Sequence, residues 1–465
     1  MTTLVGGPDD RGYVDGPLAP DAGHAAKVQN VQGIVADADG TIFFTRGDAV
    51  CALRDSVVTT VAGTSGLSGY QDGAASTALF HNPRALALGF GGLLVADHNN
   101  HRIRLISRSG EVRTLAGNGE KGQQDGPVGA GSLTSPVGLA FDSANDVLYV
   151  TCADHRLRRI QADGSITTLA GTEAGTAVGY GPTTACFNVP LGIALGRNGH
   201  IYVANFYAHS IVRYDTATRH VLPIAGSAGN LGNSLGTGKA ARFKHPREMI
   251  CDGEGNLIIC DCENAQIKKC TPEGVVTLVA GGAEGFEDGE EGRFQMPWAI
   301  SFDRDGSLCV TDYGAHAIRR VVGHALTPSP SCISFARGTL PQSTLKVDLQ
   351  GIFHSGLGGD VTFRVVSGDA GAPPTEIVAH KCVLDARCRD IIGVIEQEPV
   401  DQGGAANANE GTDTGGGVRN GTPHNITIDD VSEESVRAML EYVSCCAVVH
   451  GRSSMPLLRL LLQNC

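Results

Sequence analysis

One pattern recurs along the first 323 residues of this 465-residue chain. A proline is followed by an apolar strand, a Gly/Asp turn, a second strand, an Asn/His loop, a third strand and a run that ends in Ala-Gly. The unit prolines stand 51 to 56 residues apart, at Pro83, Pro136, Pro190, Pro246 and Pro297. An earlier unit begins near Val31, so the chain contains six units. Self-similarity at a period of this length indicates a repeat architecture.

A single unit contains four short strands. In one of them the strands are RALAL (84–88), LLVAD (93–97), RIRLI (102–106) and EVRTLAG (111–117). Short alternating strands joined by Gly turns form an antiparallel meander. Such a sheet buries both faces only when neighbouring units stack against it. The sequence therefore predicts an all-β, six-bladed β-propeller over residues 1–323.

The sixth unit lacks a fourth strand. After Pro297 it supplies WAISF, LCVTD and AIRRVV, and then the pattern stops. The fourth strand of another unit contains TTLAG (167–171), and the chain opens with TTLVGG at residues 2–7. We therefore predict that residues 2–7 complete the last blade, so that both ends of the domain close the ring.

The units resemble NHL repeats, which are named for an Asn-His-Leu trio. The counterpart of that trio here is the Asn-His-Arg-Ile segment at 100–103. The linkers GYQDGAASTALFHNP (69–83) and GFEDGEEGRFQMP (285–297) are also similar to those of this family. The resemblance covers roughly residues 1–323 and recurs in each unit.

Histidines recur at one register of the Asn/His loop in four units. They are His101, His155, His209 and His316. Side chains at the same register of different blades lie on a ring and do not converge on one ion. We therefore expect the loops to use these side chains to hold backbone together, and we expect no metal site there.

The character of the chain changes after residue 323. Residues 324–345 carry Pro and Ser without the repeat and are predicted to be a linker. Three motifs follow in order: DVTF from Asp360, AHKCVL from Ala379, and HNITIDDVSEESVRAMLEYV at 424–443. These motifs are similar to the BTB (POZ) fold, which identifies residues 346–465 as a smaller α/β, BTB-like domain. The resemblance implies a mainly structural role for Asp360, Phe363, His380, Lys381 and Leu384.

The C-terminal segment departs from the BTB pattern in two places. Residues 397–423 are rich in Gly, Ala, Asn and Asp, which predicts a disordered insertion. After residue 443 the chain has the sequence SCCAVVHGRSSMPLLRLLLQNC, where the family continues with further helices. We expect this domain to have an incomplete C-terminus.

Charge and targeting signals restrict the partners. The chain has a formal charge of −13, and residues 1–323 carry 26 Lys and Arg against 33 Asp and Glu. Nucleic acid is therefore an unlikely general partner, because phosphate binding relies on a positive surface. The first residues lack a secretory signal, and the chain lacks an apolar run long enough to span a membrane. We expect a cytoplasmic or nuclear protein with no membrane contact.

Side chains that follow the unit prolines should rim the central channel. They are Gln32, Arg84, Val137, Leu191, Arg247 and Trp298, with His81, Lys244 and His245 close by in sequence. This set suits neither Ca²⁺ nor Zn²⁺, so we expect no metal, no cofactor and no catalytic residue. An Arg/Trp rim suits an acidic or aromatic peptide, which makes Arg84, Arg247, Trp298, His81, Lys244 and His245 the candidate client-binding residues. Surface arginines without a ligand are an alternative that stays open.

Four cysteines fall on successive strands of the fifth unit. They are Cys251, Cys260, Cys262 and Cys270. Four thiolates suit zinc, but their spacing lacks a Cys-x-x-Cys pair. Buried thiols that pack as small apolar groups are the favoured interpretation.

These observations lead to three functional hypotheses. The first is a non-enzymatic adaptor, in which the propeller binds a client while the BTB-like domain forms a homodimer. The BTB resemblance also implies recruitment of a cullin-based ubiquitin ligase. The second is a propeller hydrolase or lyase with an appended module. The third is an RNA-binding NHL propeller, for which Arg84, Lys244 and Arg247 offer a local basic patch.

Overall fold

The computed structural model describes residues 1–18, 25–181, 183–196 and 199–323, together with four later strands. The chain divides into two compact units, Met1–Ala336 and Arg337–Cys465. Each unit is considered by itself. Among the described residues, no helix is long and apolar enough to cross a membrane.

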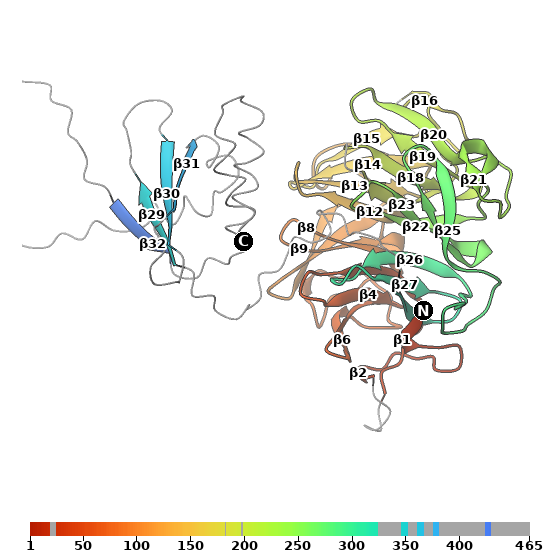
Figure 1. Cartoon of the computed structure of the whole chain (residues 1–465), viewed down its shortest axis with the longest axis horizontal. Helices are drawn as coiled ribbons and strands as arrows, with labels where there is room; N and C mark the ends of the chain where they lie inside the picture. Colours follow the sequence, from red (N-terminus) through yellow and green to blue (C-terminus); the bar gives the residue numbers. More distant parts are fainter. Residues whose placement is uncertain are drawn as a thin grey trace, which may run out of the picture. The chain divides into compact units, whose positions relative to one another are not determined.

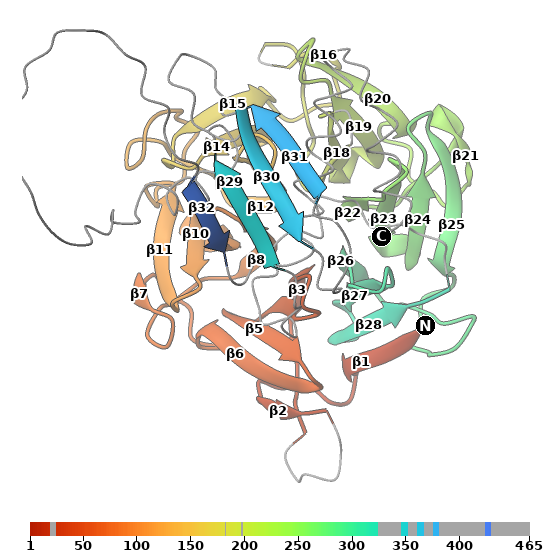
Figure 2. The ribbon, with the colours of Figure 1, turned by 60° about the vertical axis from the view of Figure 1, so that its left-hand side comes forward.

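The first unit is a six-bladed β-propeller, as predicted (Figures 1 and 2). Its blades are antiparallel sheets that follow one another around an axis. Blade 1 contains β3 (Val31–Ala36), β4 (Ile42–Arg46), β5 (Ala49–Arg54) and β6 (Val57–Gly63). Blade 2 contains β8 (Pro83–Gly89), β9 (Gly92–Asp97), β10 (Arg102–Ser107) and β11 (Glu111–Ala116). Blade 3 contains β12 (Pro136–Asp142), β13 (Val147–Cys152), β14 (Arg156–Gln161) and β15 (Ile166–Ala170).

The remaining blades repeat this order. Blade 4 contains β17 (Pro190–Leu195), β18 (Ile201–Asn205), β19 (Ser210–Tyr214) and β20 (His220–Gly226). Blade 5 contains β22 (Pro246–Cys251), β23 (Leu257–Asp261), β24 (Gln266–Cys270) and β25 (Val275–Gly281). Blade 6 contains β26 (Pro297–Phe302), β27 (Leu308–Asp312) and β28 (Ala317–Val321). Four short linker strands lie outside blades 1, 2, 4 and 5: β2 (Gly16–Pro17), β7 (Gly73–Ala74), β16 (Gly179–Tyr180) and β21 (Gly236–Thr237).

The outer strand of blade 6 comes from the start of the chain. Strand β1 (Thr2–Gly6) runs antiparallel to β28, with Thr3 opposite Arg319 and Val5 opposite Ile318. Figure 2 shows the two strands side by side. Val5 is buried in a core cluster that also contains residues of blades 1 and 6. The ring is therefore closed by hydrogen bonds between segments from opposite ends of the propeller sequence.

The core of the propeller lies between its blades. In each linker, the third residue before the first strand of the next blade is apolar and fully buried. These residues are Val28, Phe80, Leu133, Phe187, Phe243 and Phe294. Phe243, for example, packs with Tyr202, Met249 and Ile259 between blades 4 and 5. The linkers thus contribute to the hydrophobic core as the strands do, which fixes where each inner strand begins.

Glycines bring the inner strands of neighbouring blades into backbone contact. A Cβ atom on Gly33 would lie 1.8 Å from the carbonyl oxygen of Arg84. A Cβ atom on Gly192 would lie 1.8 Å from the carbonyl oxygen of Arg247. No side chain fits at such a separation, so these positions require glycine. The contacts fix the backbone that carries both arginines.

A charged clip ties several linkers to their blades. In blade 2 the clip consists of Arg104, which is fully buried, with Asp72 from the linker and Asp97 from the end of β9. The guanidinium bonds to Asp97 Oδ2 at 2.8 Å. The other carboxylate, that of Asp72, accepts a hydrogen bond from the backbone N–H of Thr114 on the outer strand. One cation therefore joins a linker, the second strand of the blade and, through Asp72, the outer strand.

The clip recurs with variations. Blades 3 and 6 use Arg158 with Asp125 and Asp154, and Arg319 with Asp288 and Asp312. Blade 1 uses Arg46 with Asp15, and blade 5 uses Lys268 with Asp261. In blade 4, Val212 occupies the position of the cation, and Val178 stands where the linker aspartate would be. Val178 is half exposed, as is Leu235 at the corresponding place in blade 5.

The second unit contains one described sheet. Strands β29 (Lys346–Gly351), β30 (Asp360–Val366), β31 (Thr375–His380) and β32 (His424–Ile428) pair antiparallel in the order β31-β30-β29-β32.

Three residues of the BTB-like pattern fall on these strands. Asp360 and Phe363 lie on β30, and His380 ends β31. Lys381, Leu384, the linker at 324–345, the insertion at 397–423 and the C-terminal segment lie outside the described residues. The BTB-like domain stays a prediction.

Closure by β1 leads to the first testable prediction. The substitution Val5→Asp places a carboxylate in the apolar cluster between blades 1 and 6, where it has no hydrogen-bond partner. We expect the free energy of unfolding in urea to fall by about 3 kcal/mol or more. Thr2→Asp, on the exposed end of the same strand, should change it by less than about 0.5 kcal/mol. Equal effects of the two variants would contradict a closing role for β1.

The charged clip leads to the second prediction. Asp97→Asn keeps the side-chain shape but leaves the buried guanidinium of Arg104 with Asp72 as its remaining carboxylate. Breaking a buried ion pair on one side should lower the free energy of unfolding by about 3 kcal/mol. The matched control is Asp55→Asn, whose carboxylate is exposed. Chemical denaturation measures the free energy of unfolding of both variants. If Asp97→Asn does not lower it, the clip does not stabilise the fold.

Candidate functional site

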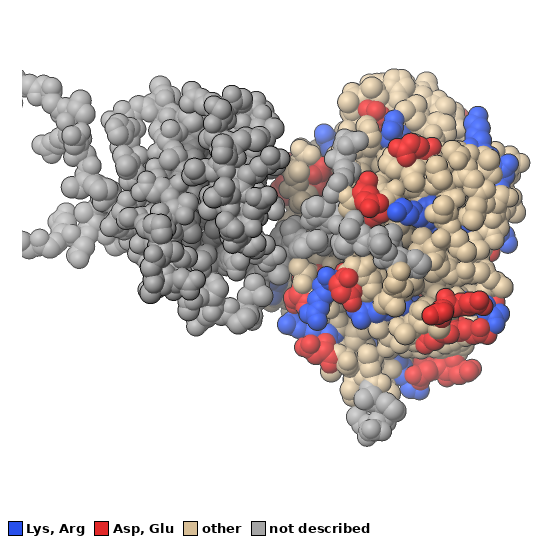
Figure 3. Space-filling view, viewed as in Figure 1, with Lys and Arg blue, Asp and Glu red and all other residues tan. Residues whose placement is uncertain are grey.

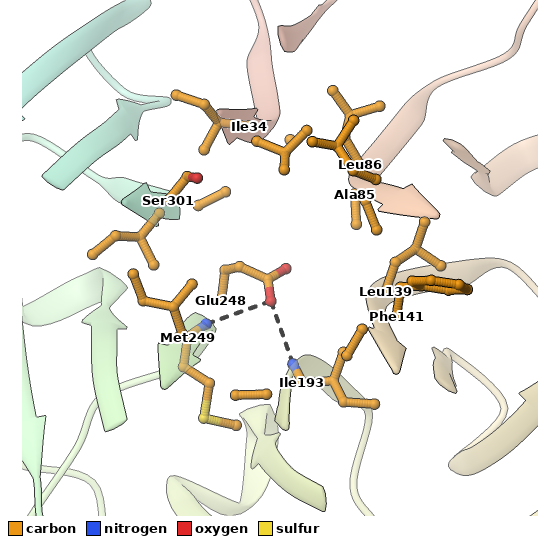
Figure 4. A pocket seen from close by; sticks show the side chains of 18 of the residues that line it. Ile34, Ala85, Leu86, Leu139, Phe141, Ile193, Glu248, Met249 and Ser301 are labelled. Carbon is orange, nitrogen blue, oxygen red and sulfur yellow. Dashed lines mark hydrogen bonds between the residues drawn. The ribbon is translucent and has the colours of Figure 1, made fainter. Parts of the chain in front are cut away.

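The six side chains that follow the strand-initiating residues meet on the propeller axis. Gln32, Arg84, Val137, Leu191, Arg247 and Trp298 line one small cavity of about 20 Å³. We call this group the axial mouth. Next to it, the inner strands enclose a largely apolar channel of about 160 Å³, lined for example by Ile34, Leu86, Leu139 and Met249 (Figure 4).

Aromatic rings hold one arginine of the axial mouth in place. The guanidinium carbon of Arg247 lies 3.0 Å from the centroid of the Trp298 ring and 5.6 Å from that of Phe206. Trp298 in turn stacks on Tyr313, with ring centroids 4.3 Å apart. A guanidinium over an aromatic face gains cation–π attraction. The plane of Arg247 is therefore fixed by rings from blades 4 and 6.

Neither arginine of the axial mouth forms an ion pair with an acidic side chain among the described residues, although the charge of Glu248 acts on Arg247. Arg247 is only 6% exposed, and the Nε of Arg84 is buried without a hydrogen-bond acceptor. Burial lowers the pKa of Arg84. Burial also lowers the pKa of Arg247 to about 9, and the like charge of Arg84 acts in the same direction. The axial mouth thus holds two cations that repel each other.

The other candidate residues are placed differently. His245 Nδ1 lies 2.7 Å from Glu263, and Lys244 Nζ lies 3.4 Å from the same carboxylate. The charge of Lys244 is therefore compensated locally, and His245 lies against the same carboxylate. His245 also stacks on Phe206 with ring centroids 4.5 Å apart, which joins it to the rings around Arg247. His81 lies before β8, where its backbone N–H donates to Asp97, and it does not line the axial mouth.

Three residues that sequence reasoning missed complete the surroundings of the axial mouth. Phe206, Tyr313 and His98 each follow the second strand of a blade, directly after Asn205, Asp312 or Asp97. His98 Nδ1 lies 3.1 Å from the carbonyl oxygen of Pro136. Burial, followed by the charge of Arg84, lowers the pKa of His98 to about 4, so its ring is neutral. Comparison of this one position across the six units would have revealed the group.

Glu248 is a fourth residue that the sequence did not single out. In the other five units the equivalent position holds a small residue: Gly33, Ala85, Gly138, Gly192 or Ala299. The Glu248 carboxylate points into the apolar channel (Figure 4). It accepts long hydrogen bonds from the backbone N–H groups of Ile193 at 3.3 Å and Met249 at 3.4 Å. Burial raises its pKa to about 7.

The loop histidines bridge neighbouring blades. In each case Nδ1 accepts a hydrogen bond from a backbone N–H just before the next inner strand: His101 from Ser135, His155 from Val189, His209 from His245, and His316 from Asn30. Burial lowers the pKa of all four, which favours the neutral ring that accepts. The histidines thus hold backbone together, but that of the next blade rather than of their own loop.

The cysteines of blade 5 lie on opposite faces of one sheet. Cys251 and Cys270 pack in the core shared with blade 4, whereas Cys260 packs in the core shared with blade 6. Burial raises the pKa of Cys270 and of Cys262 to about 12, which disfavours the thiolate that zinc requires. In the part of the chain that the structure describes, no group of three His, Cys, Asp or Glu side chains is arranged to hold a metal ion.

Comparisons with known proteins agree with the repeat and the fold. A model of the NHL repeat matches residues 187–214. Protein SUPPRESSOR OF QUENCHING 1, chloroplastic, from Arabidopsis thaliana is 33% identical over 280 residues, which span 56% of this chain and 26% of that protein. NHL repeat-containing protein 2 from Homo sapiens is 32% identical over 164 residues, or 31% of this chain and 22% of that protein. The chain thus spans about a quarter of the length of these relatives.

A solved structure matches the propeller more fully. An auxiliary nutrient binding protein from Bacteroides thetaiotaomicron aligns with a TM-score of 0.52 and 19% identity, over 69% of this chain and 75% of that one. At this identity the likeness concerns the fold alone. The predicted NHL repeat and six-bladed propeller are therefore confirmed.

Glu248 leads to the third prediction. Because its pKa is about 7 in the folded protein and near 4.5 in the unfolded chain, the folded state binds more protons between these values. Stability should therefore fall as the pH rises from about 4.5 to 7 and change little from this group above that range. Glu248→Gln removes the charge and should raise the free energy of unfolding by about 3 kcal/mol at pH 8, with a smaller gain at lower pH. Urea titrations across this range measure the gain. The control is Glu111→Gln, at an exposed position of β11, and parallel pH profiles of the two variants would contradict the assignment.

Proposed function

We propose that this protein is a non-enzymatic interaction adaptor of the cytoplasm or the nucleus, whose propeller binds a client protein at the axial mouth. The observation that carries the proposal is a continuous row of rings and cations across blades 4, 5 and 6. We call it the aromatic row, and it consists of Tyr207, His245, Phe206, Arg247, Trp298 and Tyr313. Tyrosine, tryptophan and arginine are the residue types most enriched where protein interfaces gain their energy.

The aromatic row reaches the surface at Tyr207. This side chain is 53% exposed and packs edge-on against His245, with ring centroids 5.4 Å apart. An exposed ring held by a neighbouring ring loses little conformational entropy when a partner covers it. Tyr207 therefore provides a peripheral contact, whereas Arg247 and Trp298 provide a preorganised contact at the axis.

Features of the propeller favour an adaptor over the two alternatives. For a hydrolase or lyase, the axial mouth lacks paired carboxylates or a nucleophile beside a base, and Glu248 stands alone in the channel. For an RNA-binding protein, a basic face is needed. On the described residues seen in Figure 3, Lys and Arg lie interspersed with Asp and Glu. Lys244, which contributed to the basic patch, lies beside Glu263.

The role of the C-terminal unit is proposed from its sequence motifs. The BTB-like segments at 360–363, 379–384 and 430–442 support a homodimer that recruits a cullin. Size exclusion with light scattering of the full chain, with and without a cullin N-terminal domain, tests both parts. A dimer whose mass increases by the bound cullin is the expected result. A monomer whose mass does not change when the cullin is added would contradict both parts, and the proposed interactions would then be those of the propeller alone.

Client binding leads to the fourth prediction. Tyr207→Ala should remove client contacts with little loss of stability, because the ring is exposed. Trp298→Ala should remove the same contacts by releasing Arg247. In proximity labelling with quantitative mass spectrometry, we expect one set of proteins to lose at least tenfold in signal with both variants. The matched control is Tyr70→Ala, an exposed tyrosine in the linker before blade 2. If no protein loses labelling signal with Tyr207→Ala and Trp298→Ala, clients bind elsewhere.

A further inference from the structure

We propose that the axial mouth binds a carboxylate group between Arg84 and Arg247. The inference deepens the proposed client binding and rests on it for the source of the carboxylate, which is an acidic residue or a chain terminus of the client. The binding site itself is testable without a client.

Arg247 is set apart from the other buried cations of the described residues, because it forms no ion pair with an acidic side chain. The fully buried cations on the outer parts of the blades, Arg46, Arg104, Arg158, Lys268 and Arg319, each pair with at least one aspartate. Arg247, which is 6% exposed, pairs with none, and Arg84 is half-buried with its Nε atom shielded from water and without an acceptor. An unpaired buried charge costs several kcal/mol, roughly, and is stabilised by an ion of opposite sign. A chain that supplies a carboxylate for each of its other buried cations leaves Arg247, with the charge of Arg84 nearby, for a ligand.

The charges around the axial mouth add to this positive site. Arg84 and Arg247 act together on His98, and their charge helps to keep that ring neutral. The carboxylate of Glu248 lines both the axial mouth and the channel, but it bonds to backbone N–H groups and forms no ion pair with either arginine. Figure 4 shows it directed toward the middle of the channel. The two guanidinium groups are thus the charged groups available to a ligand at the opening of the axial mouth.

The limited space at the axial mouth favours a small, flat anion. The cavity of about 20 Å³ has room for roughly one water-sized oxygen atom, so one carboxylate oxygen enters it and the rest of the group lies at its opening. A carboxylate brings two oxygens in one plane, which match the planar donors of guanidinium groups. Phosphate and sulfate carry four oxygens in a tetrahedron and need more room. The backbone contacts at Gly33 and Gly192 hold the strands that carry Arg84 and Arg247, so the cavity does not widen without moving whole blades.

Thermal unfolding and calorimetry of the full chain in an anion-poor buffer test the proposal. The probes are sodium acetate, inorganic phosphate and three short capped peptides: one with an Asp side chain, one with Asn in its place and one with a free C-terminal carboxylate. We expect acetate to raise the unfolding temperature and phosphate to raise it less at equal ionic strength. The Asp peptide and the free-terminus peptide distinguish the two sources, and the Asn peptide should not bind. A larger effect of phosphate, or equal effects of the Asp and Asn peptides, would overturn the proposal.

Two variants separate ligand binding from a structural role. Arg84→Gln should weaken acetate binding at least tenfold, yet leave the ligand-free protein equally or more stable, because it removes repulsion from Arg247. Arg247→Lys keeps the charge but loses the planar donors, and it should also bind at least tenfold more weakly. The matched control is Arg113→Gln, at an exposed position of β11. If Arg84→Gln lowers the unfolding temperature and keeps acetate binding, the arginine is structural and the proposal fails.

The results also distinguish this site from client binding as a whole. Suppose that Arg84→Gln abolishes acetate binding while Tyr207→Ala leaves client binding unchanged. That result would support the carboxylate site and refute the aromatic row as a client surface. Clients that depend on Tyr207 but not on Arg84 would support the adaptor and refute a carboxylate anchor.

Discussion

The close approach of the inner strands is the constraint on which the axial mouth depends. Where Gly33 faces the carbonyl of Arg84, and Gly192 that of Arg247, the backbones touch with no side chain between them. These contacts join β3 to β8 and β17 to β22, and β1 completes the last blade of the ring. The placement of two unpaired guanidinium groups at the axis is therefore a consequence of backbone packing and ring closure. The aromatic rings then orient Arg247 within this frame.

Periodicity predicted most of the propeller, because each unit must bury the same faces against its neighbours. The prolines and Val31 located the inner strands, and counting along the repeat named the side chains that now line the axial mouth. Exceptions to the repeat were harder to see. Glu248 occupies a position that holds Gly or Ala in the other five units. A search for what the units share does not reveal the one unit that differs.

Other features depend on three-dimensional contacts that no local pattern encodes. The sequence placed Lys244 and His245 among the candidate client-binding residues, whereas the fold brings both to Glu263. The same holds for the four cysteines of blade 5, since only the pleat of the sheet reveals that Cys260 points away from Cys251 and Cys270. The charged clip likewise joins Asp72 and Arg104, 32 residues apart, through a fold that the linker itself helps to build.

Closure by β1 also orders events during synthesis. The first residues of the propeller leave the ribosome long before β28, so the strand that seals the ring must wait for its partner until nearly the whole domain has been made. Blades 1 to 5 pair strands within themselves and can form as they emerge. Trp298 lies on the last blade, and the ring of inner strands is continuous only once that blade has docked. The axial mouth is thus incomplete in every nascent fragment that ends before blade 6.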